Sequence, residues 1–240
     1  MNILAIGAHP DDCEEFCAGT LALYRRAGHR VVMCSATNGN IGSTTLSKEE
    51  TARVRLGEAR RSAAVIGAEY ICLDYDDELL YDTPETRMRV LDLMRYAQAD
   101  VVFTHPPRDY CPDHECISKI VHDAIVMVSI PNLVTEHPPY AGTPCLYYFE
   151  SQNGVGFVPE EYVDITETME TKKRMYACHE SQAAWMSENF ADSYAGGKEQ
   201  FFESIVVQAR YRGLQCGVTY AEGFSLCRDA FRIPVRRLLP

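Results

Sequence analysis

The 240-residue sequence has no long apolar run, no excess of basic residues and no CxxC pair among its ten cysteines. The first apolar stretch, residues 3–7, is interrupted at His9 and Asp11, too early for a signal peptide or a membrane span. Many of the scattered cysteines stand inside apolar runs, where a thiol packs as a small hydrophobe. We therefore expect a soluble cytoplasmic protein without disulfides, folded as one domain over residues 1–240.

Two ligand classes are disfavoured by what is missing. The net charge of −11 argues against a broad nucleic-acid surface, which would need a basic face. The glycine-rich stretch 37–43 lacks the Gly-Lys-Ser/Thr ending of a phosphate-binding loop. The turn after the first apolar run has His9-Pro10 where a dinucleotide-binding turn needs glycine, which disfavours a nucleotide-dependent oxidoreductase.

Apolar runs of strand length alternate with segments of helical periodicity. The expected strands are 3–7, 30–36, 70–74, 99–104, 146–149 and 162–165. Helices are expected after the first strand as far as Gly28 and over 47–67, 84–98, 115–128, 167–178 and part of 196–213. This alternation predicts a Rossmann-like, doubly wound and mostly parallel sheet in the order 3-2-1-4-5, with helices on both faces. Residues after about 130 would elaborate one edge of the sheet.

Two polar clusters follow the first and the fourth expected strand. The first is Ala8-His9-Pro10-Asp11-Asp12-Cys13-Glu14, and the second lies within residues 105–114. In the doubly wound order these strands are neighbours whose following loops diverge and open a crevice. We therefore expect clusters about 100 residues apart in the sequence to meet at one crevice.

The residue types in these clusters suit a catalytic metal. A catalytic zinc ion usually has three protein ligands and one open position. His9, Asp12 and His114 would supply such a set, which also suits iron(II) or another divalent ion. Asp11 would be free to act as general base towards a water molecule, and Asp113 to orient a neighbouring group.

Plainer roles are open for the same residues. Asp11 and Asp12 could serve only as caps of a helix N-terminus, and each histidine could be structural. Arg55 could hold a substrate hydroxyl or an anionic group, or could pair with acidic neighbours on a solvated helix face.

At this point the sequence resembles a known family. Ala8-His9-Pro10-Asp11-Asp12 followed by Glu14, with Asp109-Tyr110-Cys111-Pro112-Asp113-His114 downstream, is similar to the two signature motifs of the LmbE-like (PIG-L) zinc-dependent N-deacetylases. These enzymes remove acetyl groups from N-acetylglucosamine-containing molecules. The resemblance implies zinc bound by His9, Asp12 and His114, with Asp11 as the base.

Further similarities are the Thr37-Asn38-Gly39 loop and Arg55 with Glu58-Ala59. We expect Asn38, Arg55 and Tyr110 to contact the substrate, and Asp113 to act beside Asp11 in catalysis. The expected substrate is a small N-acetyl-sugar conjugate, and the resemblance also implies a homo-oligomer.

One position departs from the family pattern. The family usually has His-Pro-Asp-His where this chain has Cys111-Pro112-Asp113-His114. Cys111 could be a further metal ligand, a weaker proton donor or a sign of altered activity, and His105 or Tyr110 could replace the missing histidine. We expect Pro112 to turn the sulfur away from the metal. The alternative function is therefore a non-catalytic or altered metal- or sugar-binding member of the family.

Overall fold

The structure, a computed structural model, describes residues 1–190, 196–229 and 232–240. Its described strands form one sheet in the order β3-β2-β1-β4-β5-β7-β6. The strands are β1 (Asn2–Gly7), β2 (Arg30–Thr37), β3 (Glu69–Tyr75), β4 (Val101–Thr104), β5 (Cys145–Phe149), β6 (Glu161–Asp164) and β7 (Ala221–Leu226). Strands β1 to β5 run parallel, as predicted and in the predicted order. The sequence did not predict β7, which is antiparallel to both β5 and β6.

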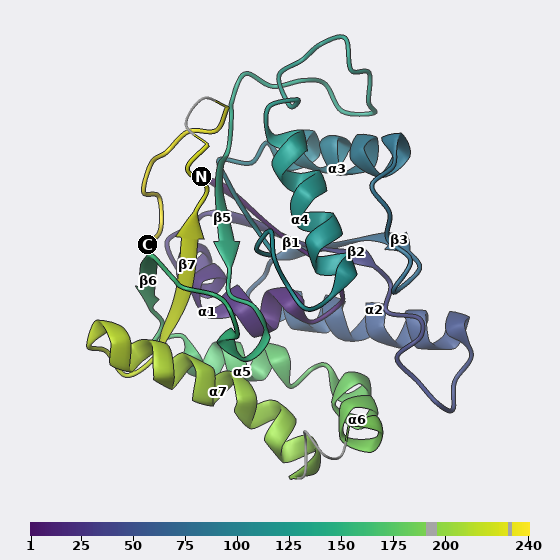
Figure 1. Cartoon of the computed structure of the whole chain (residues 1–240), viewed down its shortest axis with the longest axis vertical. Helices are drawn as coiled ribbons and strands as arrows, with labels where there is room; N and C mark the ends of the chain where they lie inside the picture. The colour runs from purple at the N-terminus through teal and green to yellow at the C-terminus, as the bar shows by residue number, and fades with distance from the viewer. Residues whose placement is uncertain (191–195, 230–231) are drawn as a thin grey trace.

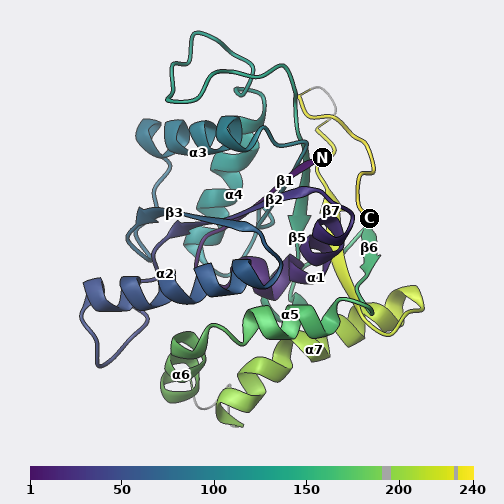
Figure 2. The same cartoon turned by 180° about the vertical axis from the view of Figure 1, so that it is seen from behind.

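Helices cover both faces of this sheet (Figures 1 and 2), which confirms the predicted fold class. They are α1 (Asp12–Arg26), α2 (Lys48–Val65), α3 (Pro84–Ala97), α4 (Pro112–Ile125), α5 (Met169–Tyr176), α6 (Glu180–Asn189) and α7 (Gly197–Cys216). One face packs against α3 and α4, and the other against α1, α5 and α7. Helix α6 was not predicted.

The alternation of side chains along β1 explains its continuous apolar sequence. Ile3 and Ala5 pack on the α1 face, whereas Leu4 and Ile6 pack on the α4 face. A parallel strand that is buried on both faces reads as an unbroken apolar run. The first loop therefore leaves the sheet from its centre, between β2 and β4.

Local sequence signals set the helix starts that matter for the site. Ser47 accepts a hydrogen bond from the Glu50 amide, and the Glu50 carboxylate accepts one from the Ser47 amide, as the predicted capping box requires. Pro112 occupies the first turn of α4, where its missing N–H costs nothing. Helix α4 therefore begins three residues earlier than expected and carries His114 in its first turn.

A buried charge network joins the unpredicted strand β7 to α1. The Glu222 carboxylate accepts hydrogen bonds from the backbone amides of Gly19 and Thr20, at 2.9 and 2.8 Å. Lys172 of α5 donates to the same carboxylate at 2.7 Å and to the Glu15 carbonyl at 2.6 Å. These contacts hold α1, α5 and β7 together behind the first loop. Within the described part of the chain, no helix is long and apolar enough to cross a membrane.

Candidate metal centre and its cleft

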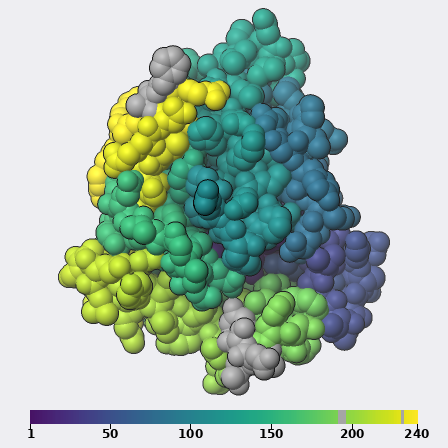
Figure 3. Space-filling view, viewed as in Figure 1, coloured from purple at the N-terminus to yellow at the C-terminus, as the bar shows by residue number. Residues whose placement is uncertain are grey.

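The loops after β1, β3 and β4 meet at the floor of a cleft with a volume of about 890 Å³. Helix α2 contributes Arg55 to this cleft, and α6 and α7 form its outer wall. In the space-filling view, the purple atoms of the N-terminal segment are recessed between the teal region above and the green helices below (Figure 3). The crevice expected from the strand order is therefore present.

Three donor side chains converge on the floor of the cleft. His9 Nδ1 lies 3.2 Å from His114 Nε2. Asp12 places Oδ2 3.6 Å from His9 Nδ1 and Oδ1 3.6 Å from His114 Nε2. Ligand bonds of 2.0–2.1 Å in a tetrahedral zinc site separate the ligand atoms by about 3.3 Å. The spacing and chemistry of this set therefore fit a divalent metal ion.

Carboxylates behind the two rings orient them. Asp109 Oδ1 lies 3.0 Å from His114 Nδ1, and Asp77 Oδ1 lies 3.0 Å from His9 Nε2. A carboxylate that accepts from one ring nitrogen fixes the tautomer and directs the other nitrogen forward. Each ring thus presents its remaining nitrogen to the point shared with Asp12.

The charges around this point favour a cation. Burial alone would raise the pKa of Asp12, but its interactions with His105, His114 and His9, hydrogen bonds among them, hold it well below its usual value. Burial alone would lower the pKa of His9, but hydrogen bonds to Asp113, Asp12 and Asp77 raise it well above its usual value. The floor of the cleft is therefore an acidic pocket that holds positive charge.

His105 supports Asp12 from behind. Its Nε2 lies 2.9 Å from Asp12 Oδ2, and its ring stacks on that of His114 with centroids 3.7 Å apart. Burial lowers the pKa of His105 to about 4, so the ring stays neutral at ordinary pH. Since the residue is fully buried and does not line the cleft, it is poorly placed to replace the histidine missing at Cys111.

Asp11 stands beside the donor set in a strained conformation. It is the N-cap residue of α1, yet its side chain makes no capping hydrogen bond, so capping does not account for the carboxylate. Its φ of 135° is rare for a residue other than glycine, and such strain often occurs at functional sites. Burial raises the pKa of Asp11 to about 6, although Arg55 acts in the opposite direction. The group thus suits a base near neutral pH.

Gly7 makes room for this arrangement. A Cβ atom at Gly7 would lie 2.6 Å from the Cβ of Asp12. The end of β1 can therefore approach the first turn of α1 only because this residue has no side chain.

The residues expected to contact substrate differ in their positions. Arg55 lines the cleft and is only 2% exposed, so the alternative of a solvated surface arginine is wrong. It donates to the Pro10 carbonyl at 2.8 Å and to Asp11 Oδ1 at 3.2 Å. Tyr110 lines the cleft with its ring 5.4 Å from that of His114. Asn38 does not line it, and donates instead to Asp74 Oδ1 at 2.9 Å.

Asp113 has a different position from the one expected of a catalytic group. It is 1% exposed and does not line the cleft. Its carboxylate accepts hydrogen bonds from the amides of Glu78 and Leu80, at 2.9 and 3.2 Å, and Oδ2 lies 3.5 Å from His9 Nε2. These contacts suit the orienting role expected of Asp113, because they hold the loop that carries Asp77 against His9.

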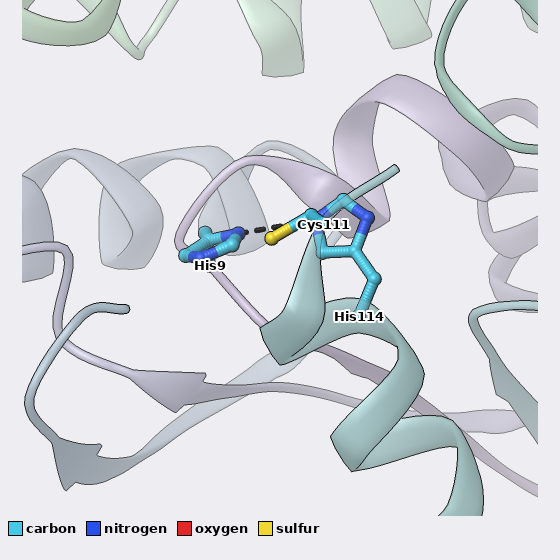
Figure 4. A group of neighbouring side chains, drawn as sticks. All are labelled: His9, Cys111 and His114. Atoms are coloured by element: carbon cyan, nitrogen blue, oxygen red, sulfur yellow. Dashed lines mark hydrogen bonds between the residues drawn. The ribbon is translucent and has the colours of Figure 1, made fainter. Parts of the chain in front are cut away.

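Cys111 does not follow the expectation that Pro112 turns its sulfur away. The sulfur lies within 4.8 Å of a ring nitrogen of His9 and of His114, and the residue is buried. Figure 4 shows the sulfur pointing between the two rings. The thiol therefore faces the same point as the donor set.

Sequence reasoning assigned no role to Asp77 or Asp109. Asp109 was visible within the second motif, at a spacing of five residues from His114. Asp77 stands in an acidic run after β3 that reads as a solvated loop, and no signal in the sequence related it to His9.

Comparison with known proteins decides the family. A family model described as PIG-L, GlcNAc-PI de-N-acetylase, matches residues 4–125. The chain belongs to the PIG-L family. Diacetylchitobiose deacetylase of Thermococcus kodakarensis is 30% identical to it, over 96% of this chain and 84% of the relative. The membership inferred from the two motifs is confirmed.

Two further relatives differ from each other in activity. The solved structure of N,N'-diacetylchitobiose deacetylase from Pyrococcus horikoshii matches with a TM-score of 0.79 and 27% identity, over 99% of this PIG-L chain and 86% of that one. The 4-oxalmesaconate hydratase of Pseudomonas putida is 24% identical, over 93% of this chain and 88% of the relative.

Proposed function

We propose that this PIG-L protein is a zinc-dependent N-deacetylase that removes the acetyl group from a small N-acetylglucosamine-type sugar conjugate. The observation that carries the proposal is the donor set of His9, Asp12 and His114 at tetrahedral spacing, with the buried carboxylate of Asp11 beside it. The deacetylases among the relatives support the same reaction. Zinc is our choice of metal, and iron(II) is the alternative.

The roles follow from the positions of the side chains. A divalent ion held by His9, Asp12 and His114 would polarise the acetyl carbonyl group and lower the pKa of a water ligand. Asp11 takes a proton from the attacking water, since its carboxylate stands beside the donor set. Arg55 holds Asp11 in its strained position by binding both its carboxylate and the preceding carbonyl.

The remainder of the cleft suits a sugar conjugate in shape and charge. Tyr110 stands at the rim beside His114, where we propose that it contacts the substrate. Aromatic side chains of the outer wall offer flat apolar faces to a sugar ring: Trp185, Phe190 and Tyr211. Ligand sites commonly combine such apolar walls with a few placed polar groups.

The charged side chains of the cleft disfavour a second candidate function, that of a hydratase like the Pseudomonas putida relative. The substrate of that hydratase is, by its name, a carboxylate. The described lining contains seven carboxylate side chains: Asp11, Asp12, Glu15, Asp77, Glu78, Glu150 and Glu203. Arg55 is the only lysine or arginine in that lining, and it already binds Asp11. The described lining therefore offers no further lysine or arginine to bind a substrate carboxylate, so a neutral sugar fits the cleft better than an anion.

The test is acetate release from a panel of N-acetylglucosamine conjugates, including N,N'-diacetylchitobiose, by metal-stripped and zinc-loaded protein. We expect equimolar acetate and primary amine, and only from the zinc-loaded protein. The hydratase substrate is assayed in parallel by its loss of absorbance. Conversion of that compound without acetate release would favour the hydratase. Zinc binding without turnover of any compound would favour a non-catalytic role.

Two broader properties belong to the same proposal. We propose a reducing, cytoplasmic setting, because all ten cysteines are unpaired. A homo-oligomer is expected from the family resemblance, and light scattering of the purified protein measures it directly.

A further inference from the structure

We propose that Cys111 is a fourth metal-binding side chain, whose thiolate competes with water for the open position of the centre. The inference rests on the proposed metal site and adds to it a ligand that the two-histidine, one-carboxylate set does not contain. It gives the position that departs from the family motif a defined chemistry.

The backbone places the sulfur for this role. Cys111 is the N-cap of α4, with φ −101° and ψ 127°, and its side chain makes no capping hydrogen bond. Asp109 Oδ1 accepts a hydrogen bond from the Cys111 amide at 3.2 Å and also lies 3.0 Å from His114 Nδ1. The Asp109 carboxylate therefore holds both the Cys111 backbone and the His114 ring, which keeps the Cys111 thiol close to the His114 imidazole.

The sulfur is close enough to join the set by a small movement. It lies within 4.8 Å of ring nitrogens of His9 and His114, between which it points (Figure 4). A tetrahedral zinc ion with a Zn–S bond of about 2.3 Å would separate sulfur from nitrogen by about 3.5 Å. A bound metal ion would therefore have to draw the sulfur closer to the two ring nitrogens.

The exchange of a metal-bound water molecule for the Cys111 thiolate is chemically balanced. The thiol releases its proton to solvent, a sulfur–metal bond forms, and one water molecule leaves the metal. The reverse exchange restores the water. A set of one sulfur, two nitrogens and one oxygen closes a tetrahedral centre, whereas three ligands leave it open for catalysis. Cys111 would thus hold the resting centre closed and favour zinc over harder divalent ions.

Cobalt substitution of the full-length protein tests the bond without substrate. Thiolate bound to Co²⁺ gives a strong sulfur-to-metal absorption band in the near ultraviolet, which nitrogen and oxygen ligands do not give. We expect this band in the wild-type protein at one Co²⁺ per chain. Cys111→Ser should lose it, and Cys116→Ser should keep it. Cys116 is the matched control, because it lies on the same helix and belongs to none of the metal-binding groups among the described residues.

A second measurement needs no variant. Zinc X-ray absorption of the wild-type protein should show one sulfur at about 2.3 Å from the metal. Zinc competition with a chelator should show that Cys111→Ser weakens affinity by about tenfold or more, at an unchanged melting temperature of the metal-free protein. A wild-type spectrum with only nitrogen and oxygen around a stoichiometric metal would overturn the inference.

The outcome separates this inference from the proposed function. Acetate release by a zinc protein whose spectra lack sulfur would reject the role of Cys111 and leave the deacetylase intact. A protein that binds no divalent metal would reject both.

Discussion

Replacing Asp11 by asparagine isolates the proposed general base. The substitution keeps the shape of the side chain and the oxygen that Arg55 binds at 3.2 Å. Asparagine also tolerates positive φ better than most residues, so the turn at φ 135° should persist. The substitution removes the negative charge of the side chain and its ability to accept a proton.

We expect the turnover number to fall about 10²- to 10⁴-fold, the usual contribution of general acid–base catalysis. This loss corresponds to about 3–5 kcal/mol of activation free energy. Zinc affinity should change little, because Asp11 is not one of the three proposed donors. Excess zinc should therefore restore none of the lost turnover.

Asp12→Asn is the matched control, since it changes the neighbouring carboxylate in the same way. That carboxylate has oxygens 3.6 Å from ring nitrogens of both His9 and His114, so its loss should weaken zinc binding itself. Added zinc should then restore part of the activity. The assay is acetate release under a zinc titration of both variants. If the two respond alike, the assignment of Asp11 as base and Asp12 as ligand is refuted.

Two further predictions concern groups around the donor set. Asp109→Asn should weaken zinc affinity about 10- to 100-fold, measured by chelator competition, because His114 loses the carboxylate that orients it. Unchanged affinity would show that this contact is dispensable. Burial alone would lower the pKa of His179, but Glu14, 3.2 Å from its Nε2, raises it above 6.5. The interaction of protonated His179 with Glu14 therefore stabilises the folded protein fully below about pH 6.5. This contribution is lost as the pH rises through the folded-state pKa of His179. The free energy of unfolding, measured with urea across this pH range, should fall more in the wild-type protein than in His179→Gln. Parallel pH dependence in the two proteins would contradict the assignment.

The sequence was sufficient to predict the central sheet and the meeting of the two loops. Buried parallel strands leave unbroken apolar runs, and right-handed crossovers leave few possible strand orders. Once β1 and β4 are neighbours, His9, Asp12 and His114 must approach one another. The three-residue spacing of His9 and Asp12 then brings both side chains to one side of the turn.

The parts that were missed depend on contacts between distant segments. Strand β7 contains a glycine and the charged Glu222, which read poorly as a strand, and the buried partner Lys172 comes from another helix. Asp77 reaches His9 because the loop after β3 is held by amide bonds to Asp113. The direction of the Cys111 sulfur depends on the exact backbone angles of a cap residue, which Pro112 alone does not determine.

A metal titration of the stripped protein tests the central claim most directly. Acetate release from the best N-acetylglucosamine conjugate is followed as zinc is added in known ratios to the chain. We predict that activity rises linearly and stops at one zinc per chain, and that His114→Ala loses both the tight binding and the activity. Full activity in the stripped protein, or wild-type zinc binding by His114→Ala, would contradict the proposal that His9, Asp12 and His114 form the catalytic metal centre.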